Sequence, residues 1–302
     1  MRRYVYLRTD QHLNLEGDTI LPEYGDIILV ANNNNSMIKE LSLGYTLKPG
    51  ELLIKSIEQN GRNVLIISGY NSDVTLMAAY RFAEHLGVGF GLAGDVIPDA
   101  RISYNIEGFD EVGTPLFETR GIQPFHDFLH GPDIWSTNDY KAIIAQLPKM
   151  GMNFIGLHTY PTWSTTEEKE WDERQGPEST VWIGLPEDLN EDGRVSWSYP
   201  SFYAHTQNTK SWWGASTGKT ENFYAGSSEL FPRNGYGSDA LGTSYPTDLA
   251  SSNKIFNNVG AMFNKSFELA KNIGVKTVVG TELPLGLEPA GGTEVGTDWI
   301  RG

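Results

Sequence analysis

The run MNFIGL at residues 152–157 decides the fold, because it is short and apolar, with a glycine before it and a polar residue after it. A strand that is buried on both faces of a sheet has this composition. Toward the N-terminus, apolar residues recur at helical spacing between positions 140 and 147, after cap residues at 137–139. Residues 118–125 (ETRGIQPF) form another strand candidate. Strand, helix and strand in this order predict an α/β fold built from βαβ units.

Toward the C-terminus, the pattern predicts a helix whose apolar face includes residues 259–273 and a strand at 275–282 (VKTVVGTE). A closed (β/α)₈ barrel, or TIM barrel, needs eight such units in about 250 residues. We therefore expect residues 113–302 to be only the first part of a (β/α)₈ barrel, with a long aromatic insertion at about 160–253. The missing C-terminal part of the barrel would then be a structural partner.

Residues 1–112 are predicted to form a separate small α/β domain. Strand candidates lie at 27–30, 51–57 and 63–68, and the Asn60-Gly61 turn between the last two predicts a hairpin. A helix is expected from about residue 72 to 86. All 8 tryptophans lie at or beyond Trp135, which also indicates two units of different composition.

Composition excludes several function classes. The formal net charge of −15 repels phosphate backbones and anionic surfaces, so nucleic acid is not an expected partner. No apolar stretch approaches the ~18 residues needed to cross a bilayer, so no membrane partner is expected either. The absence of cysteine removes disulfides and thiolate chemistry. The start MRRYV is not followed by the apolar region of a signal peptide, and the residues alone leave the compartment open.

Two segments in a fixed order carry a family resemblance. Residues 80–90 (YRFAEHLGVGF) and 94–98 (GDVIP) resemble the end of the small α/β domain that precedes the barrel in β-hexosaminidase-like and α-glucuronidase-like glycoside hydrolases. Residues 120–122 (RGI) are similar to the opening of their first barrel strand. The resemblance implies a glycoside hydrolase of poly- or oligosaccharides that uses carboxylate acid/base catalysis without a cofactor, in a secreted or periplasmic location.

Two departures from the family pattern limit what carries over. The β-hexosaminidase family places an Asp-Glu pair after its fourth strand, which this chain is expected to lack. Residues 123–125 also replace the aspartate that is usual in the first-strand motif. Activity on N-acetylhexosamines is therefore not implied.

Functional side chains of a (β/α)₈ barrel lie at the carboxyl ends of its strands. Glycoside hydrolysis needs two carboxyl groups, so Glu282 is the first catalytic candidate and Asp127 the second; a structural ion pair is the alternative for Glu282. His126 and His158 are candidates for binding sugar hydroxyls or for structural hydrogen bonds. Convergence of these four residues as metal ligands is a further alternative, but no close-spaced histidine motif supports it, and no metal is assigned.

The aromatic insertion carries the strongest binding signal. Aromatic rings stack on the apolar faces of sugars, which makes Tyr160, Trp163, Trp212 and Trp213 candidates for substrate binding; long loops also pack on their own aromatics. By the resemblance, Arg120 contacts hydroxyls of the terminal sugar, or else it forms a salt bridge at the strand. Besides a glycoside hydrolase, a non-catalytic carbohydrate-binding protein and a metal-dependent hydrolase remain alternatives.

Overall fold

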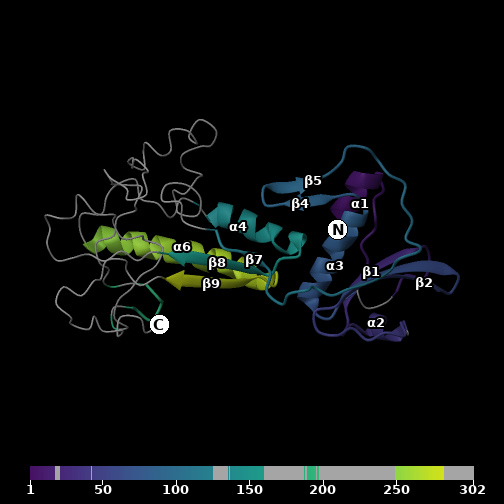
Figure 1. Cartoon of the computed structure of the whole chain (residues 1–302), viewed down its shortest axis with the longest axis horizontal. Helices are drawn as coiled ribbons and strands as arrows, with labels where there is room; N and C mark the ends of the chain where they lie inside the picture. The colour runs from purple at the N-terminus through teal and green to yellow at the C-terminus, as the bar shows by residue number, and fades with distance from the viewer. Residues whose placement is uncertain are drawn as a thin grey trace. The chain divides into compact units, whose positions relative to one another are not determined.

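The computed structural model shows a mixed α/β protein that divides into two compact units (Figure 1). It describes residues 1–17, 21–41, 43–124, 135, 137–159, 187, 189–194, 196 and 249–281. The first unit comprises Met1–Gly121, Ile143–Phe154 and Ala270–Lys276, and the second comprises Ile122–Ala142, Ile155–Leu269 and Thr277–Gly302. The predicted α/β class is confirmed.

A four-stranded sheet forms the centre of the first unit. Its strands in spatial order are β1 (Ile27–Asn32), β3 (Arg62–Gly69), β2 (Leu52–Gln59) and β6 (Asp110–Gly113). Strand β1 runs parallel to β3, whereas β2 runs antiparallel to both of its neighbours. The sheet is therefore mixed, with β1 and β6 as its outer strands.

The predicted hairpin is confirmed by the pairing of β2 with β3. Gln59 and Arg62 are partners across the turn, which leaves Asn60 and Gly61 as its two central residues. Their φ angles are 55° and 76°. Positive φ at both positions is the requirement of a type I′ turn, and the Asn-Gly sequence meets it with little strain.

Helices cover both faces of this sheet because β3 is apolar on both sides. Leu65 and Ile67 of β3 pack with Phe82 of α3 (Ser72–His85) in one core cluster. On the other face, Val64 and Ile66 pack with α2 (Ser36–Glu40). Asn71 caps α3 by accepting a hydrogen bond from the Val74 amide at 3.0 Å.

The N-terminal helix α1 (Arg2–Thr9) was not predicted. Its residue Arg8 is buried and donates from Nε to the Leu86 carbonyl at 2.7 Å, and from Nη1 to Pro98 at 2.5 Å and to Ala100. These hydrogen bonds from Arg8 therefore hold α1 against the segment that follows α3.

Gly87 does end α3, with a φ of 82°. Beyond it the chain forms a small hairpin that the sequence did not predict. Strands β4 (Gly89–Gly91) and β5 (Gly94–Val96) pair antiparallel.

The βαβ pattern predicted after residue 113 appears as a second sheet with the order β7-β8-β9. Its elements in chain order are β7 (Gly121–Ile122), α4 (Thr137–Gln146), the 3₁₀ turn η2 (Pro148–Met150), β8 (Phe154–Thr159), α6 (Leu249–Asn272) and β9 (Lys276–Thr281). Strand β7 is shorter than the predicted 118–125. The three described strands form an open sheet, and no closed barrel is seen among them.

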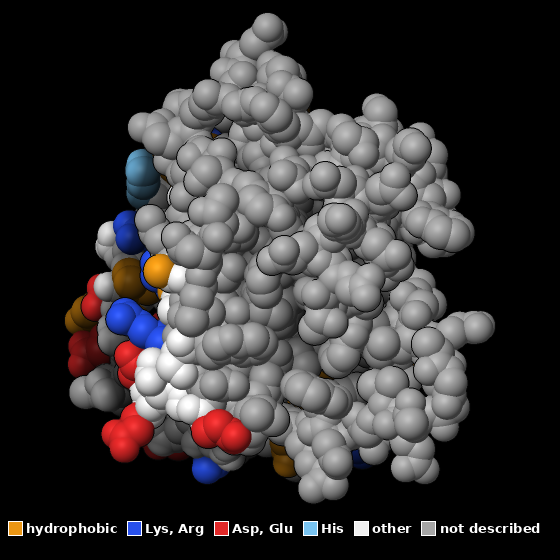
Figure 2. All heavy atoms as spheres, turned by 90° about the vertical axis from the view of Figure 1, so that its left-hand side faces the viewer, with side chains coloured by type: hydrophobic (Ala, Val, Ile, Leu, Met, Phe, Trp, Pro, Cys, Tyr) orange, Lys and Arg blue, Asp and Glu red, His pale blue; other side chains and the backbone are white. Residues whose placement is uncertain are grey.

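None of the described helices combines the length and apolar character needed to cross a membrane. Among the described side chains visible in Figure 2, acidic and basic groups lie near one another. The described part of that face therefore carries both signs of charge.

Candidate functional site

The predicted site residues follow, or lie within, the strands of the second sheet. His158 is the next-to-last residue of β8, although its side chain is outside what the structure describes. Glu282 comes directly after β9 in the sequence. The other candidates that lie outside the described residues are His126, Asp127, Tyr160, Trp163, Trp212 and Trp213. Only Arg120 among the predicted site residues has a described side chain.

Arg120 lies just before β7 and directs its guanidinium to backbone carbonyls. Its Nε donates to Gly151 at 2.7 Å, and its Nη1 donates to Phe117 at 2.5 Å and to Glu118 at 3.2 Å. Burial lowers the pKa of this guanidinium below its usual value. These contacts hold the chain around the start of β7, and binding of a sugar by Arg120 stays a prediction.

Asn153 completes the polar cluster at the starts of the strands. Its Oδ1 accepts from the Arg120 amide at 2.9 Å, and its Nδ2 donates to the Glu118 carbonyl at 2.9 Å. Its backbone carbonyl also accepts from the Lys276 amide at 2.8 Å. One asparagine thus links the chain just before β7 to the starts of β8 and β9. Because these hydrogen bonds are made to backbone groups of three segments, their role at this edge of the sheet is structural.

A second polar cluster, which the sequence did not predict, joins Tyr4, Asp95 and Lys149. The Tyr4 hydroxyl donates to Asp95 Oδ2 at 2.8 Å, and Lys149 Nζ lies 2.8 Å from Asp95 Oδ1 and 3.2 Å from Oδ2. The side chains of Asp95 and Lys149 are only 10% and 17% exposed. This partly buried ion pair and the Tyr4 hydrogen bond connect α1, β5 and η2 within the first unit.

The protonation states of this cluster follow from its geometry. Burial raises the pKa of Tyr4, and its hydrogen bond to Asp95 raises the pKa further, so the phenol stays protonated. Burial alone would raise the pKa of Asp95, but the hydrogen bonds from Lys149 and Tyr4 outweigh it and hold that pKa below its ordinary value. The opposite charges of Asp95 and Lys149 therefore pair with each other, and the cluster has a structural role in holding α1, β5 and η2 together.

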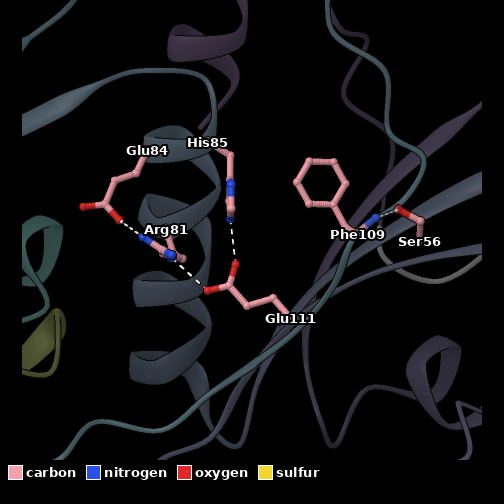
Figure 3. Close-up of polar contacts among 6 residues, drawn as sticks. All are labelled: Ser56, Arg81, Glu84, His85, Phe109 and Glu111. Carbon is pink, nitrogen blue, oxygen red and sulfur yellow. Dashed lines mark hydrogen bonds and ion pairs between the residues drawn. The ribbon is translucent and has the colours of Figure 1, made fainter.

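A third polar cluster lies between α3 and β6 (Figure 3). The carboxylate of Glu111 on β6 lies 2.8 Å from Arg81 Nε and 2.7 Å from His85 Nε2. Burial would raise the pKa of Glu111, but the hydrogen bonds from Arg81 and His85 hold it below its ordinary value. Arg81 also pairs with Glu84 at 3.0 Å.

A carboxylate paired with a histidine supplies two of the three members of a Ser-His-acid triad, and the third would be a hydroxyl next to the histidine. Ser56 is the hydroxyl drawn in Figure 3, where it appears beyond the Phe109 ring as seen from His85. Its Oγ donates to the Ile106 carbonyl at 2.5 Å and accepts from the Phe109 amide at 3.0 Å. The hydroxyl is therefore engaged by the backbone, and the geometry supports an ionic link between α3 and β6 instead of a catalytic triad.

Metal binding finds no support in the described part of the chain. Groups of three or more potential carboxylate or imidazole ligands are absent from it. Of the four alternative metal ligands, His126, Asp127 and Glu282 lie outside the described residues, as does the side chain of His158. The functional-site candidates therefore remain those that follow the strands of the second sheet.

Comparison with known proteins adds no family assignment. No protein-family model matches the chain, and no curated protein matches its sequence.

Proposed function

We propose that this chain belongs to a glycoside hydrolase acting on a poly- or oligosaccharide, and that the β7-β8-β9 sheet is the first part of its (β/α)₈ barrel. The supporting observation is the order of the second sheet. Helix α4 separates β7 from β8, α6 separates β8 from β9, and strands that are consecutive in the chain are neighbours in the sheet. In βαβ units of this kind the strands run parallel, so that their carboxyl ends share one edge.

The candidate catalytic and binding residues lie at or just after the ends of these strands in the sequence, where chemistry at that edge would need them. Asp127 follows β7 by a few residues, His158 lies near the end of β8, and Glu282 follows β9. In this proposal Glu282 and Asp127 serve as acid and base or nucleophile, since glycosidic bonds are cleaved between two carboxyl groups. His158 binds a sugar hydroxyl.

The aromatic insertion supplies the binding surface in this proposal. Trp212 and Trp213 are adjacent in a segment rich in tryptophan, tyrosine, serine and asparagine. Aromatic faces stack on pyranose rings, and the polar side chains bind hydroxyls. A non-catalytic carbohydrate-binding protein would use the same aromatic residues, but it would not depend on Glu282 for turnover.

Variants of the purified chain separate binding from catalysis. Titration with a panel of oligosaccharides is followed by tryptophan fluorescence, and hydrolysis is followed by the release of reducing ends. We expect the Trp212→Ala/Trp213→Ala variant to bind about tenfold more weakly, the equivalent of ~1.4 kcal/mol. Trp135→Phe is the matched control, because its ring packs edge-to-face on Tyr140 at 5.2 Å.

The carboxylate variants Glu282→Gln and Asp127→Asn address the chemistry. We expect them to retain oligosaccharide affinity and to lose any turnover that the wild-type chain shows. Turnover that is unchanged in both variants would exclude their catalytic roles. Wild-type binding without any turnover, together with unchanged binding by both variants, would favour the non-catalytic alternative.

A further inference from the structure

An open cavity of about 650 Å³ lies along the outer strand β1 of the first unit. Its walls come from residues 11–17, from residues 104–107 and from the first four residues of β1. This volume is within the range of sites that bind ligands or short peptide segments. We call this cavity and its rim the edge groove.

Among the described residues, no strand pairs with β1 on the side away from β3. Strand β1 is the end member of the order β1-β3-β2-β6, and its register involves only β3. Within the described residues, no backbone hydrogen bond reaches the outer edge of residues 27–30. A strand edge of this kind presents N–H and C=O groups that can pair with another extended chain.

Exposed apolar side chains surround the same groove. Leu15, Tyr24 and Val30 line it and are 82%, 85% and 40% exposed. Single exposed apolar residues are common, but several around one cavity are typical of a surface that binds another molecule. The apolar side chains and the free strand edge therefore occur together.

The rim of the groove is mainly acidic. Glu16, Asp26 and Glu107 line it and are exposed, whereas the groups of opposite sign in the lining are exposed Arg2 and the amino terminus at Met1. Asn63 donates from its backbone N–H to Asp26 at 3.0 Å and from Nδ2 to Glu107 at 2.9 Å, which fixes both carboxylates near the groove. The rim thus favours a positively charged occupant.

We propose that the edge groove binds an extended segment of another protein in which basic and apolar residues alternate, and that this segment adds to β1 as a further strand. Successive side chains of a strand point to opposite faces. Alternate residues of the bound segment would therefore fill the apolar cavity, while the residues between them reach the acidic rim. Main-chain pairing supplies affinity, and the alternation supplies specificity.

A peptide series tests this proposal on the wild-type chain. A fluorescein-labelled short peptide of alternating lysine and valine is titrated and followed by fluorescence anisotropy. We expect saturable binding that is at least about tenfold weaker for two matched peptides. One has glutamate in place of lysine, and the other has a central proline that removes a ladder N–H donor. Hydrogen exchange should slow at the amides of Ile28 or Val30 when the first peptide is bound.

Two double variants test whether the acidic rim of the edge groove contributes to peptide binding. Glu16→Gln/Glu107→Gln should weaken binding of the lysine–valine peptide several-fold. The control Glu40→Gln/Glu58→Gln removes the same charge from exposed positions outside the groove and should leave the affinity unchanged. Each variant is compared with the wild type by circular dichroism to establish that it is folded.

Four outcomes would overturn the proposal. They are no saturable binding of the lysine–valine peptide, equal binding of the proline peptide, equal weakening by the two double variants, and exchange protection only at sites away from β1. Occupation of the groove by a second copy of the chain, seen as a dimer in sedimentation that the peptide does not dissociate, would also contradict it.

Discussion

The ion pair between Asp95 and Lys149 provides a quantitative test of how the first unit is held together. Lys149→Met removes the ammonium group while keeping most of the side-chain volume. The two side chains are 10% and 17% exposed, with their charged atoms 2.8 Å apart. Exposed ion pairs contribute at most about 1 kcal/mol, whereas breaking a buried pair costs about 3–5 kcal/mol. The intermediate exposure of this pair leads us to expect a loss of about 2 kcal/mol in unfolding free energy.

Asp95→Asn should cost at least as much, because it leaves the Lys149 ammonium partly buried without a carboxylate and weakens the acceptor of the Tyr4 hydroxyl. The double variant should lose less than the sum of the two single losses, because both single changes break the same interaction. The assay is hydrogen exchange of peptides from β3 and α3, which lie in the core of the first unit. A loss of ~2 kcal/mol raises the exchange rate of the slowest amides about 30-fold.

The pH dependence of this effect has a defined sign. The pKa of Asp95 is lower in the folded chain than its ordinary value of about 3.9. The stabilisation from its ionised form is therefore fully present above that value and is lost as the pH falls through the folded pKa. The difference between wild type and Lys149→Met should be constant above about pH 5 and should shrink at lower pH. Strictly additive losses, or a difference that grows on acidification, would refute this reasoning.

Four further predictions concern the fold and its exposed strand edge. Phe82→Ala removes a fully buried ring and should lower the unfolding free energy by about 3–5 kcal/mol in urea titrations. Gly121→Ala would place a Cβ 2.0 Å from the Phe154 carbonyl oxygen, so the strands must separate; a melting temperature equal to that of the wild type would contradict this close approach. Asn71→Ala removes the N-cap of α3 and should cost about 1 kcal/mol by thermal unfolding. We expect the exposed edge of β9, the last strand of the described order β7-β8-β9, to promote self-association of the wild type in light scattering, and Val279→Lys, at an exposed position of this strand, should reduce it.

Elements with a strong local pattern were predictable from the sequence. The β2–β3 hairpin follows from two apolar runs around Asn60-Gly61, whose backbone adopts the positive φ angles that this dipeptide accepts. Helix α3 follows from its apolar spacing, its Asn71 cap and the glycine after it. In both cases the deciding interactions lie within a few residues of one another.

Other elements depend on distant contacts and were missed. Helix α1 contains several arginines, and its stability in the fold relies on buried Arg8, whose carbonyl partners lie about ninety positions away in the sequence. The acidic strand β6 is short and is identified by its pairing with β2. The glycine-rich β4–β5 hairpin has too few side chains to show an alternating pattern.

The candidate site divides in the same way. Placement of Glu282 and His158 relative to strands β9 and β8 was predictable from strand and helix order. The contacts of Arg120 were not predictable. They are made to the backbone carbonyls of Gly151, Phe117 and Glu118, which no sequence motif marks. The polar cluster of Tyr4, Asp95 and Lys149 brings together three positions far apart in the chain, and no sequence motif predicts its contacts.

The most direct test of the proposed carbohydrate function is isothermal titration calorimetry of the wild-type chain against a panel of oligosaccharides that differ in sugar and linkage. The proposal predicts saturable heat with at least one oligosaccharide, at a dissociation constant between about 1 μM and 1 mM, the range in which KM values usually lie, and weaker heat for the Trp212→Ala/Trp213→Ala variant. The absence of saturable binding across the whole panel, by a chain that melts cooperatively, would contradict it.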